Sequence, residues 1–223
     1  MRSPQTVLET LRKHALEAHY QYERLYRNLY NPQLYLLAYQ NLYANKGSMT
    51  AGADGVTLSG MSLKRIESLI QKLRDRSYQP HPARRQYIPK KSGNGLRPLG
   101  IPAADDKLVQ EAVRMILESI YEPTFQSTSH GFRPGKSCHT ALQQISSDFT
   151  SVIWFIEGDI KGCFDNIDHE TLIAIRGRKI KDSKFLNIIR QFLKAGYIEN
   201  WKYNKTYSGM PQERQIRARG TDS

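Results

Sequence analysis

A run of five large apolar residues that ends shortly before an aspartate most constrains the fold of this 223-residue chain. The run occupies residues 152–156, and Glu157, Gly158 and Asp159 follow it directly. A short apolar run bounded by turn-forming residues is typical of a strand buried on both faces. Asp159 then falls where the predicted strand meets its turn, which is a usual place for functional carboxylates in α/β sheets.

The acidic residues near this run have different explanations. Asp168 is well placed to cap the N-terminus of a helix, and we favour this role over a catalytic one. Asp165 can order the turn, and His169 is better explained as a local hydrogen-bond partner than as a general base. Asp159 has no comparable capping role, and burying it without a partner would be unfavourable. A cation would remove that penalty, and Mg²⁺ with oxygen ligands fits best.

The net charge points to a polyanionic partner. The chain has a formal charge of +12 at pH 7 and a pI near 9.7, which favours nucleic acid. A membrane is disfavoured, because no apolar run approaches the ~20 residues of a membrane span. The N-terminus lacks the apolar core of a signal peptide, so we expect a cytoplasmic location. Cys138 and Cys163 have no paired metal-binding spacing, and we expect both to be reduced and structural.

Basic residues are concentrated in a predicted β-hairpin. Its strands cover residues 84–91 and 96–102, and residues 92–95 form the turn. Between the first and last of its basic residues the chain has no acid; the five are Arg84, Arg85, Lys90, Lys91 and Arg97. A solvated basic edge would explain scattered lysines, but here the like charges share one two-stranded ribbon. We therefore expect the hairpin to bind a triphosphate or a nucleic-acid backbone.

Three segments have helical patterns. Residues 5–30 are expected to form one helix. Tyrosines recur at a spacing of four in two sets, Tyr22/Tyr26/Tyr30 and Tyr35/Tyr39/Tyr43; we favour a core stripe over a base-stacking platform, and both can apply at different tyrosines. Ser62 is expected to cap an amphipathic helix, and Asp105 and Asp106 to start another, with acids at its positive end. The predicted buried face of the first of these two comprises Ile66, Leu69, Ile70 and Leu73.

A glycine-containing loop near residue 135 partly matches a phosphate-binding P-loop. The residues Gly135-Lys136-Ser137 match the end of that motif, but the position five before Gly135 is His130 and not glycine. We therefore reject the P-loop. Arg133 and Lys136 are still expected to lie near phosphates in this basic loop.

Several motifs together resemble one family. Residues 159–169, Asp-Ile-Lys-Gly-Cys-Phe-Asp-Asn-Ile-Asp-His, resemble the first catalytic motif of bacterial group II intron reverse transcriptases, the intron-encoded maturases. Similar blocks occur in the family's order at residues 50–55, 85–90, 97–102 and 130–134. The resemblance extends from about Asn31 to Gln212.

The resemblance implies an α+β fold, with right-hand polymerase fingers and a truncated palm built on a small antiparallel sheet with helices. We expect a helical N-terminal extension with a glycine-rich loop over residues 1–60, fingers over 61–150 and a partial palm over 151–212. Residues 213–223 depart from the family pattern and are expected to be disordered. A frameshift or a truncated gene copy is our hypothesis for this tail.

The resemblance also assigns roles to residues of the fingers. Lys90 and Arg97 are implied to grip the incoming triphosphate, in agreement with the interpretation of the basic hairpin. The candidates for RNA binding are Arg84, Arg85, Lys91, Arg133 and Lys136.

In the palm, the resemblance makes Asp159 the first metal-binding aspartate, with the Ile160 carbonyl as a second ligand. Phe164 matches the position whose bulk excludes a ribose 2′-hydroxyl and selects dNTPs. Gln212 matches the glutamine beside the nucleotide pocket. The residues alone give no sign of the last two roles, since a buried aromatic and a surface amide are the default explanations.

Two function classes remain open. The first is an RNA-directed DNA polymerase that uses two Mg²⁺ ions, an RNA template, a DNA primer and dNTPs. Such a site needs a second carboxylate, which the family supplies from a Tyr-Ala-Asp-Asp hairpin that this sequence lacks, so we expect the chain to be inactive alone. The second is a non-catalytic basic module that binds intron RNA. A homo-oligomer, a complementing palm fragment and an unfolded product are further alternatives.

Overall fold

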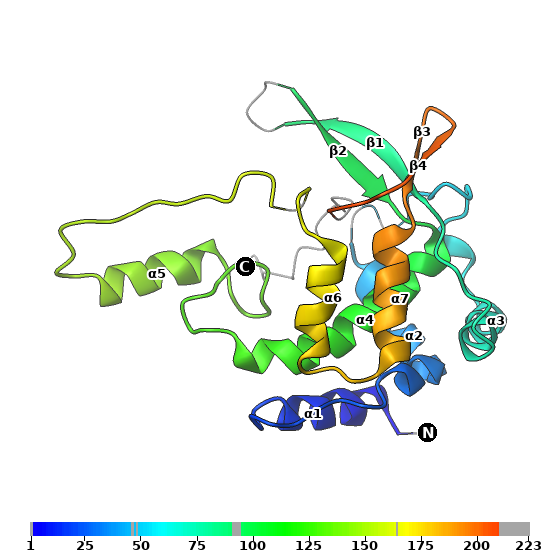
Figure 1. The fold of residues 1–223 in the computed structure, drawn as a ribbon, viewed down its shortest axis with the longest axis horizontal. Helices are drawn as coiled ribbons and strands as arrows, with labels where there is room; N and C mark the ends of the chain where they lie inside the picture. Colours follow the sequence, from blue (N-terminus) through cyan, green and yellow to red (C-terminus); the bar gives the residue numbers. More distant parts are fainter. Residues whose placement is uncertain (1, 46, 48, 91–94, 164, 210–223) are drawn as a thin grey trace.

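The chain folds into helices packed against one another and a small sheet that stands on them (Figure 1). The computed structural model describes residues 2–45, 47, 49–90, 95–163 and 165–209. Within these residues the α-helices are α1 (Pro4–His14), α2 (Pro32–Tyr43), α3 (Leu63–Arg74), α4 (Ala104–Tyr121), α5 (Cys138–Asp148), α6 (His169–Gly177) and α7 (Ser183–Lys194). The strands are β1 (Ala83–Pro89), β2 (Leu96–Ile101), β3 (Tyr197–Glu199) and β4 (Lys202–Asn204), and short 3₁₀ helices are η1 (Tyr26–Tyr30), η2 (Leu58–Gly60) and η3 (Glu122–Thr124). The α+β class expected from the sequence is thereby confirmed.

The core lies between helices α2, α3 and α4. Ser62 caps α3 by accepting a hydrogen bond from the Arg65 N–H, and all four residues predicted for the inner face of α3 are buried. Helix α4 has acids in its first turn, as predicted. Burial of these amphipathic faces removes apolar surface from water, which is the main force holding the helices together.

The expectation of one helix over residues 5–30 is wrong. Helix α1 ends at His14, and the chain continues without a regular helix until η1. Tyr22 instead pairs with Ile180 as an isolated parallel bridge, in which the Tyr22 N–H donates to the Lys179 carbonyl. These tertiary hydrogen bonds replace the helical ones. The core explanation of the tyrosines is confirmed for Tyr22, Tyr26 and Tyr35, which are buried.

The sheet joins two hairpins that are far apart in the sequence. Its strand order is β2-β1-β3-β4. The β1–β2 and β3–β4 pairs are antiparallel, whereas β1 and β3 are parallel, so the sheet is mixed. Only Ala83 with Tyr197 and Arg84 with Ile198 are in register across the parallel pair. The predicted basic hairpin is confirmed as β1–β2, and the domain boundary expected at residue 150 stays a prediction.

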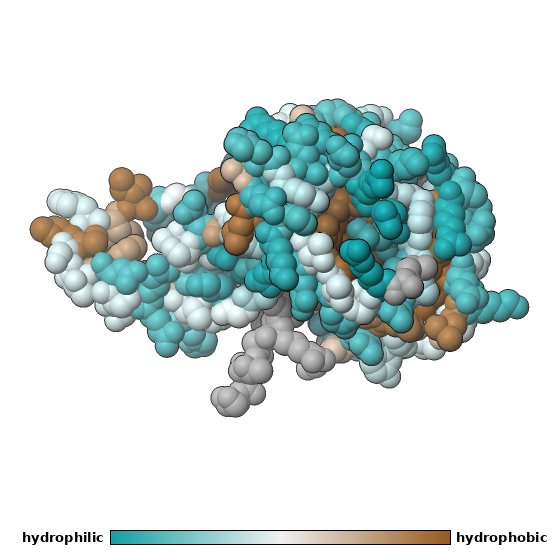
Figure 2. All heavy atoms as spheres, turned by 90° about the horizontal axis from the view of Figure 1, so that it is seen from below, coloured by the Kyte–Doolittle hydropathy of each residue, from teal (hydrophilic) through white to brown (hydrophobic). Residues whose placement is uncertain are grey.

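The predicted buried strand at residues 152–156 is not formed. These residues lie in an extended segment outside any strand, and the side chains from Ile153 to Ile156 are 85–99% exposed. A strand buried on both faces needs neighbouring strands, and no described strand pairs with this segment. The segment and α5 project together from the helical body (Figure 1). Figure 2 shows hydrophobic residues gathered at this projecting end.

None of the helices in the described ranges combines the length and the apolarity needed to cross a membrane.

Candidate nucleic-acid and nucleotide site

The β1–β2 hairpin places two of the predicted triphosphate-binding residues on one face. Ile88 is directly opposite Arg97, and the Lys90 N–H extends the ladder by donating to the Gly95 carbonyl at 3.0 Å. Residues two apart on a strand share a face, as do residues directly opposite each other. Lys90 and Arg97 are therefore diagonal neighbours on the same face, and both are exposed.

The two arginines at the base of β1 have different environments. Arg84 donates from Nε and Nη2 to the Ala51 carbonyl, at 3.2 and 3.0 Å, and so ties the hairpin to the preceding loop. Arg85 points to the opposite face, where its guanidinium lies 3.5 Å from the centre of the Tyr197 ring. The Glu199 carboxylate is 4.0 Å from Arg85 Nη1. Arg85 is thus held by a cation–π contact and a weak ion pair.

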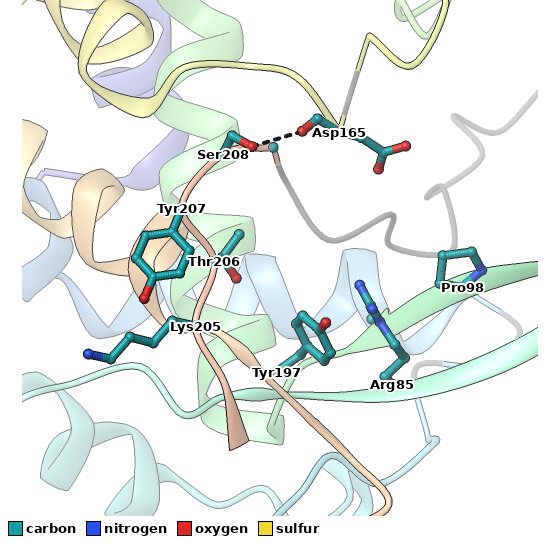
Figure 3. Close-up of a pocket in the computed structure, with 10 residues that line it drawn as sticks. Arg85, Pro98, Asp165, Tyr197, Lys205, Thr206, Tyr207 and Ser208 are labelled. Atoms are coloured by element: carbon teal, nitrogen blue, oxygen red, sulfur yellow. Dashed lines mark hydrogen bonds between the residues drawn. The ribbon is translucent and has the colours of Figure 1, made fainter. Parts of the chain in front are cut away.

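Arg85 faces a hollow of ≈ 220 Å³ between the hairpin and residues 205–209. Pro98 and Gly100 of β2 form one wall, and Asp165 lies at the far side. Figure 3 shows Arg85 and Tyr197 on one side of this space and residues 205–208 on the other. Neither Lys90 nor Arg97 lines the hollow, because both lie on the other face of the hairpin.

Residues 205–209 are anchored to the start of α6. The Ser208 hydroxyl donates to the Asp165 carbonyl at 3.1 Å, as Figure 3 shows, and the Gly209 N–H donates to the Ile167 carbonyl at 2.8 Å. Nε2 of the buried His169 lies 2.7 Å from the Gly209 carbonyl oxygen. His169 is a hydrogen-bond partner as expected, but its partner is 40 positions along the chain and not local. Sequence reasoning missed this contact, because a backbone carbonyl leaves no signal in the sequence.

Asp168 has the capping role favoured from the sequence. Its carboxylate accepts a hydrogen bond from the Thr171 N–H at 2.7 Å, at the N-terminus of α6. The hydrogen bonds with Thr171 lower the pKa of Asp168 below its usual value. The capping interpretation of Asp168 is therefore confirmed.

Asp159 and Ile160 lie exposed on the extended segment that follows the apolar run. In the described part of the chain, no three His, Cys, Asp or Glu side chains form a group that could hold a metal ion. A two-metal site needs carboxylates from at least two places. The described residues therefore do not fit a complete Mg²⁺ site.

The remaining predicted residues are separated from this site. Arg133 pairs with Glu122 at 2.9 Å and donates to the Gln126 and Ser129 carbonyls, both at 2.8 Å, so its donors serve the local loop. Lys136 lies in the next turn, half-buried. The roles of both in RNA binding stay predictions. Lys91, Phe164 and Gln212 lie outside the described residues.

Comparison with known proteins identifies the protein family of the chain. The family model for reverse transcriptase (RNA-dependent DNA polymerase) matches residues 88–212, which is more than half of the chain. The chain therefore belongs to the reverse transcriptase family.

Relatives of the chain include group II intron-encoded proteins. The chain is 55% identical over 213 residues to the group II intron-encoded protein LtrA of Lactococcus lactis subsp. cremoris, covering 95% of this chain and 36% of LtrA. It is 38% identical over 199 residues to Protein YkfC of Escherichia coli, covering 85% of this chain and 52% of YkfC. It is 39% identical over 93 residues to nuclear intron maturase 1, mitochondrial, of Arabidopsis thaliana, covering 42% of this chain and 13% of that protein. The chain is therefore similar to group II intron-encoded proteins, and it spans about a third of the length of LtrA.

Proposed function

We propose that residues 1–223 form the RNA-gripping fingers and the first part of the palm of an RNA-directed DNA polymerase, and that this polypeptide binds RNA but does not polymerise alone. The observation that carries the proposal is the exposed position of Asp159 on an unpaired segment. A polymerase carboxylate must face a second one across a narrow metal site. Among the described residues, no three His, Cys, Asp or Glu side chains form a group that could hold a metal ion.

The charge and the free cations of the hairpin support RNA binding. The ion pairs formed among the described residues involve neither Lys90 nor Arg97. Two unpaired cations on one exposed face repel each other, and a phosphate would relieve that repulsion. In a complete polymerase the same pair would hold the triphosphate of a dNTP.

Polymerisation would need a further segment that supplies the second carboxylate. The apolar side chains of residues 152–156 are exposed, and large exposed apolar patches mark surfaces that become covered by a partner. A strand carrying a second aspartate, paired with this segment, would cover it and place two carboxylates near each other. Asp159 and the Ile160 carbonyl would then be ligands of Mg²⁺, which neutralises charge in phosphoryl transfer. An RNA template and a DNA primer are the substrates of this assembly. Homo-oligomerisation and a cytoplasmic location stay predictions.

A primer-extension assay tests the lack of activity. The purified 223-residue chain is incubated with a primed RNA template, Mg²⁺ and dNTPs, beside the Asp159→Ala variant. We expect no extended product from either. Extension by the wild-type chain that Asp159→Ala abolishes would refute the inactivity proposal.

A binding titration tests the proposal that the chain binds RNA. We expect the affinity for a structured intron RNA to fall steeply between 50 and 200 mM salt, as counterion release requires. The double variant Lys90→Gln/Arg97→Gln should reduce the slope of log K against log salt by about 2, one unit per lost phosphate contact. The matched control is Lys64→Gln/Lys72→Gln on α3, which removes the same charge elsewhere. Equal effects of the two double variants would show that net charge alone, and not the hairpin, binds the RNA.

A further inference from the structure

The β3–β4 hairpin presents aromatic side chains to solvent. Trp201 lies at its turn and is 99% exposed, Tyr203 on β4 is 52% exposed, and Tyr207 just beyond β4 is 81% exposed. Fixed aromatic groups are normally buried in a core or an interface, because their apolar surface is large. The rings of Trp201 and Tyr207 are not buried in the core of this chain, and about half of Tyr203 is exposed.

The backbone conformation of the turn does not explain why a tryptophan occupies position 201. Glu199 pairs with Lys202, so Asn200 and Trp201 form a two-residue loop, with φ of 49° and 62°. Positive φ at both positions is typical of a type I′ turn, which favours Asn followed by Gly. A bulky residue at the second position is disfavoured by its side chain. The turn therefore holds Trp201 in an unfavourable conformation that glycine would adopt freely.

A cavity lies beside Tyr203 and Tyr207, and lysines lie next to the aromatic residues in the sequence. A space of ≈ 430 Å³ lies between the start of α6 and residues 203–207 and is lined by Tyr203, Lys205 and Tyr207. Asp168, Glu170 and Lys194 also line it, and Glu170 is neutralised by its ion pairs with Arg190 and Lys194. Figure 3 shows Lys205 and Tyr207 pointing to one side of the chain and Thr206 to the other. Among the described residues no acid forms an ion pair with Lys202 or Lys205.

The composition of this surface separates it from a protein-docking patch. Residues 201–209 read Trp-Lys-Tyr-Asn-Lys-Thr-Tyr-Ser-Gly, with no aliphatic side chain. The apolar run at residues 152–156 has the opposite character, being apolar throughout and without charge. Exposed aromatics that alternate with lysines provide faces for stacking bases and charges for the intervening phosphates.

We propose that Trp201, Tyr203 and Tyr207 form a stacking platform for unpaired bases of a single-stranded nucleic acid, with Lys202 and Lys205 contacting its phosphates. The platform rests on the proposed RNA-binding function and adds to it a second, distinct contact. The β1–β2 hairpin binds through charge, whereas the β3–β4 hairpin binds through base faces. The ligand is a single strand, because the π-faces of paired bases are covered by their neighbours in the stack.

Binding of a fluorescently labelled 12-nucleotide oligo(U) to the full chain tests the platform. We expect Trp201→Ala to weaken binding about tenfold, from the loss of stacking with one base, and Trp201→Phe to retain most of the affinity. The matched control is Trp154→Ala, which removes the other exposed tryptophan of the chain from the apolar segment and should leave affinity unchanged. Equal weakening by Trp154→Ala and Trp201→Ala would overturn the proposal.

An abasic oligomer of the same length and charge separates stacking from electrostatics. Wild type and Trp201→Ala should bind it equally, since it has no bases to stack. The same tests with oligo(dT) should give the same pattern, because stacking does not use the 2′-hydroxyl. If oligo(U) binds with the expected salt dependence but Trp201→Ala has wild-type affinity, the platform fails while the RNA-binding proposal stands. If neither structured RNA nor oligo(U) binds, the proposed function itself fails.

Discussion

The carboxylate of Asp182 accepts a hydrogen bond from the backbone N–H of Tyr26 at 2.8 Å, across 156 positions of the chain. The other carboxylate oxygen accepts from the N–H groups of Lys184 and Phe185 and so caps α7. One buried side chain thereby starts a helix and fixes the N-terminal segment against it.

Replacing Asp182 should therefore destabilise the whole chain. Asp182→Ala removes the cap and leaves the buried Tyr26 N–H without a partner, which together should lower the free energy of unfolding by about 2 to 4 kcal/mol. Urea denaturation followed by circular dichroism measures the change. Asp168→Ala is the control, because it removes the cap of α6 at an exposed site with no long-range hydrogen bond and should have a smaller effect. Equal losses in the two variants would contradict the linking role of Asp182.

The pairing of α6 with α7 should weaken in acid. Glu170 forms ion pairs with Arg190 and Lys194, and these contacts lower the pKa of its carboxyl from 4.5 to about 2. A carboxyl whose pKa is lower in the folded state stabilises the fold above its unfolded pKa and loses that effect as pH falls through its folded pKa. We expect the Tm difference between wild type and Glu170→Gln to be greatest above pH 5 and to vanish near pH 2. Glu67→Gln on α3, where no described cation forms an ion pair with the residue, should show no such trend. The ion pairs are exposed, so the difference should also shrink in high salt.

Gly196 is expected to be essential for the β3–β4 hairpin. Its φ is +76°, and a Cβ there would clash with the Asn204 carbonyl oxygen and lie 2.7 Å from the Tyr203 ring. Gly196→Ala should destabilise the hairpin by at least about 1 to 2 kcal/mol from the left-handed backbone alone. Hydrogen exchange should then show faster exchange of the β3 and β4 amides. Gly60→Ala, whose added Cβ would meet no atom within 4 Å, is the control and should leave these amides unchanged.

The exposed apolar segment should govern solubility and not stability. Ile153→Lys and Phe155→Lys replace side chains that make almost no contact with the body, so Tm should change by less than the error of the measurement. Aggregation at high concentration and binding of a hydrophobic dye should both fall, because the exposed apolar patch becomes smaller. A large drop in Tm would mean that these side chains pack against the protein in solution.

Local patterns in the sequence predicted the elements whose stability is local. The amphipathic helix after Ser62, the helix that begins near Asp105 and the basic hairpin all form, because their periodicity and turn residues specify them without distant partners. The Asp168 cap was also predictable, since a capping side chain and the N–H that it binds are three residues apart.

Predictions from the sequence were wrong or missing where contacts between distant residues determine the structure. The N-terminal helix is shorter than predicted because Tyr22 pairs with Ile180. The residues around Tyr22 carry no pattern that predicts this partner. The segment at residues 152–156 has the composition of a buried strand, but composition does not supply the strands on either side. The contact of His169 with Gly209 and the exposed Trp201 were missed for the same reason, since both depend on the hairpin that follows α7.

The position of β1 between β2 and β3 has a consequence for folding during synthesis. The β1–β2 hairpin is local and can form as soon as it leaves the ribosome, but its second edge stays open until Tyr197 and Ile198 have been made. An open strand edge is a template for pairing with other chains. The basic residues that we propose to bind nucleic acid also lie on this hairpin, and their mutual repulsion between copies would delay such mispairing until β3 has been made. The charge of the hairpin would thus reduce mispairing of the nascent chain, independently of any ligand that the folded chain binds.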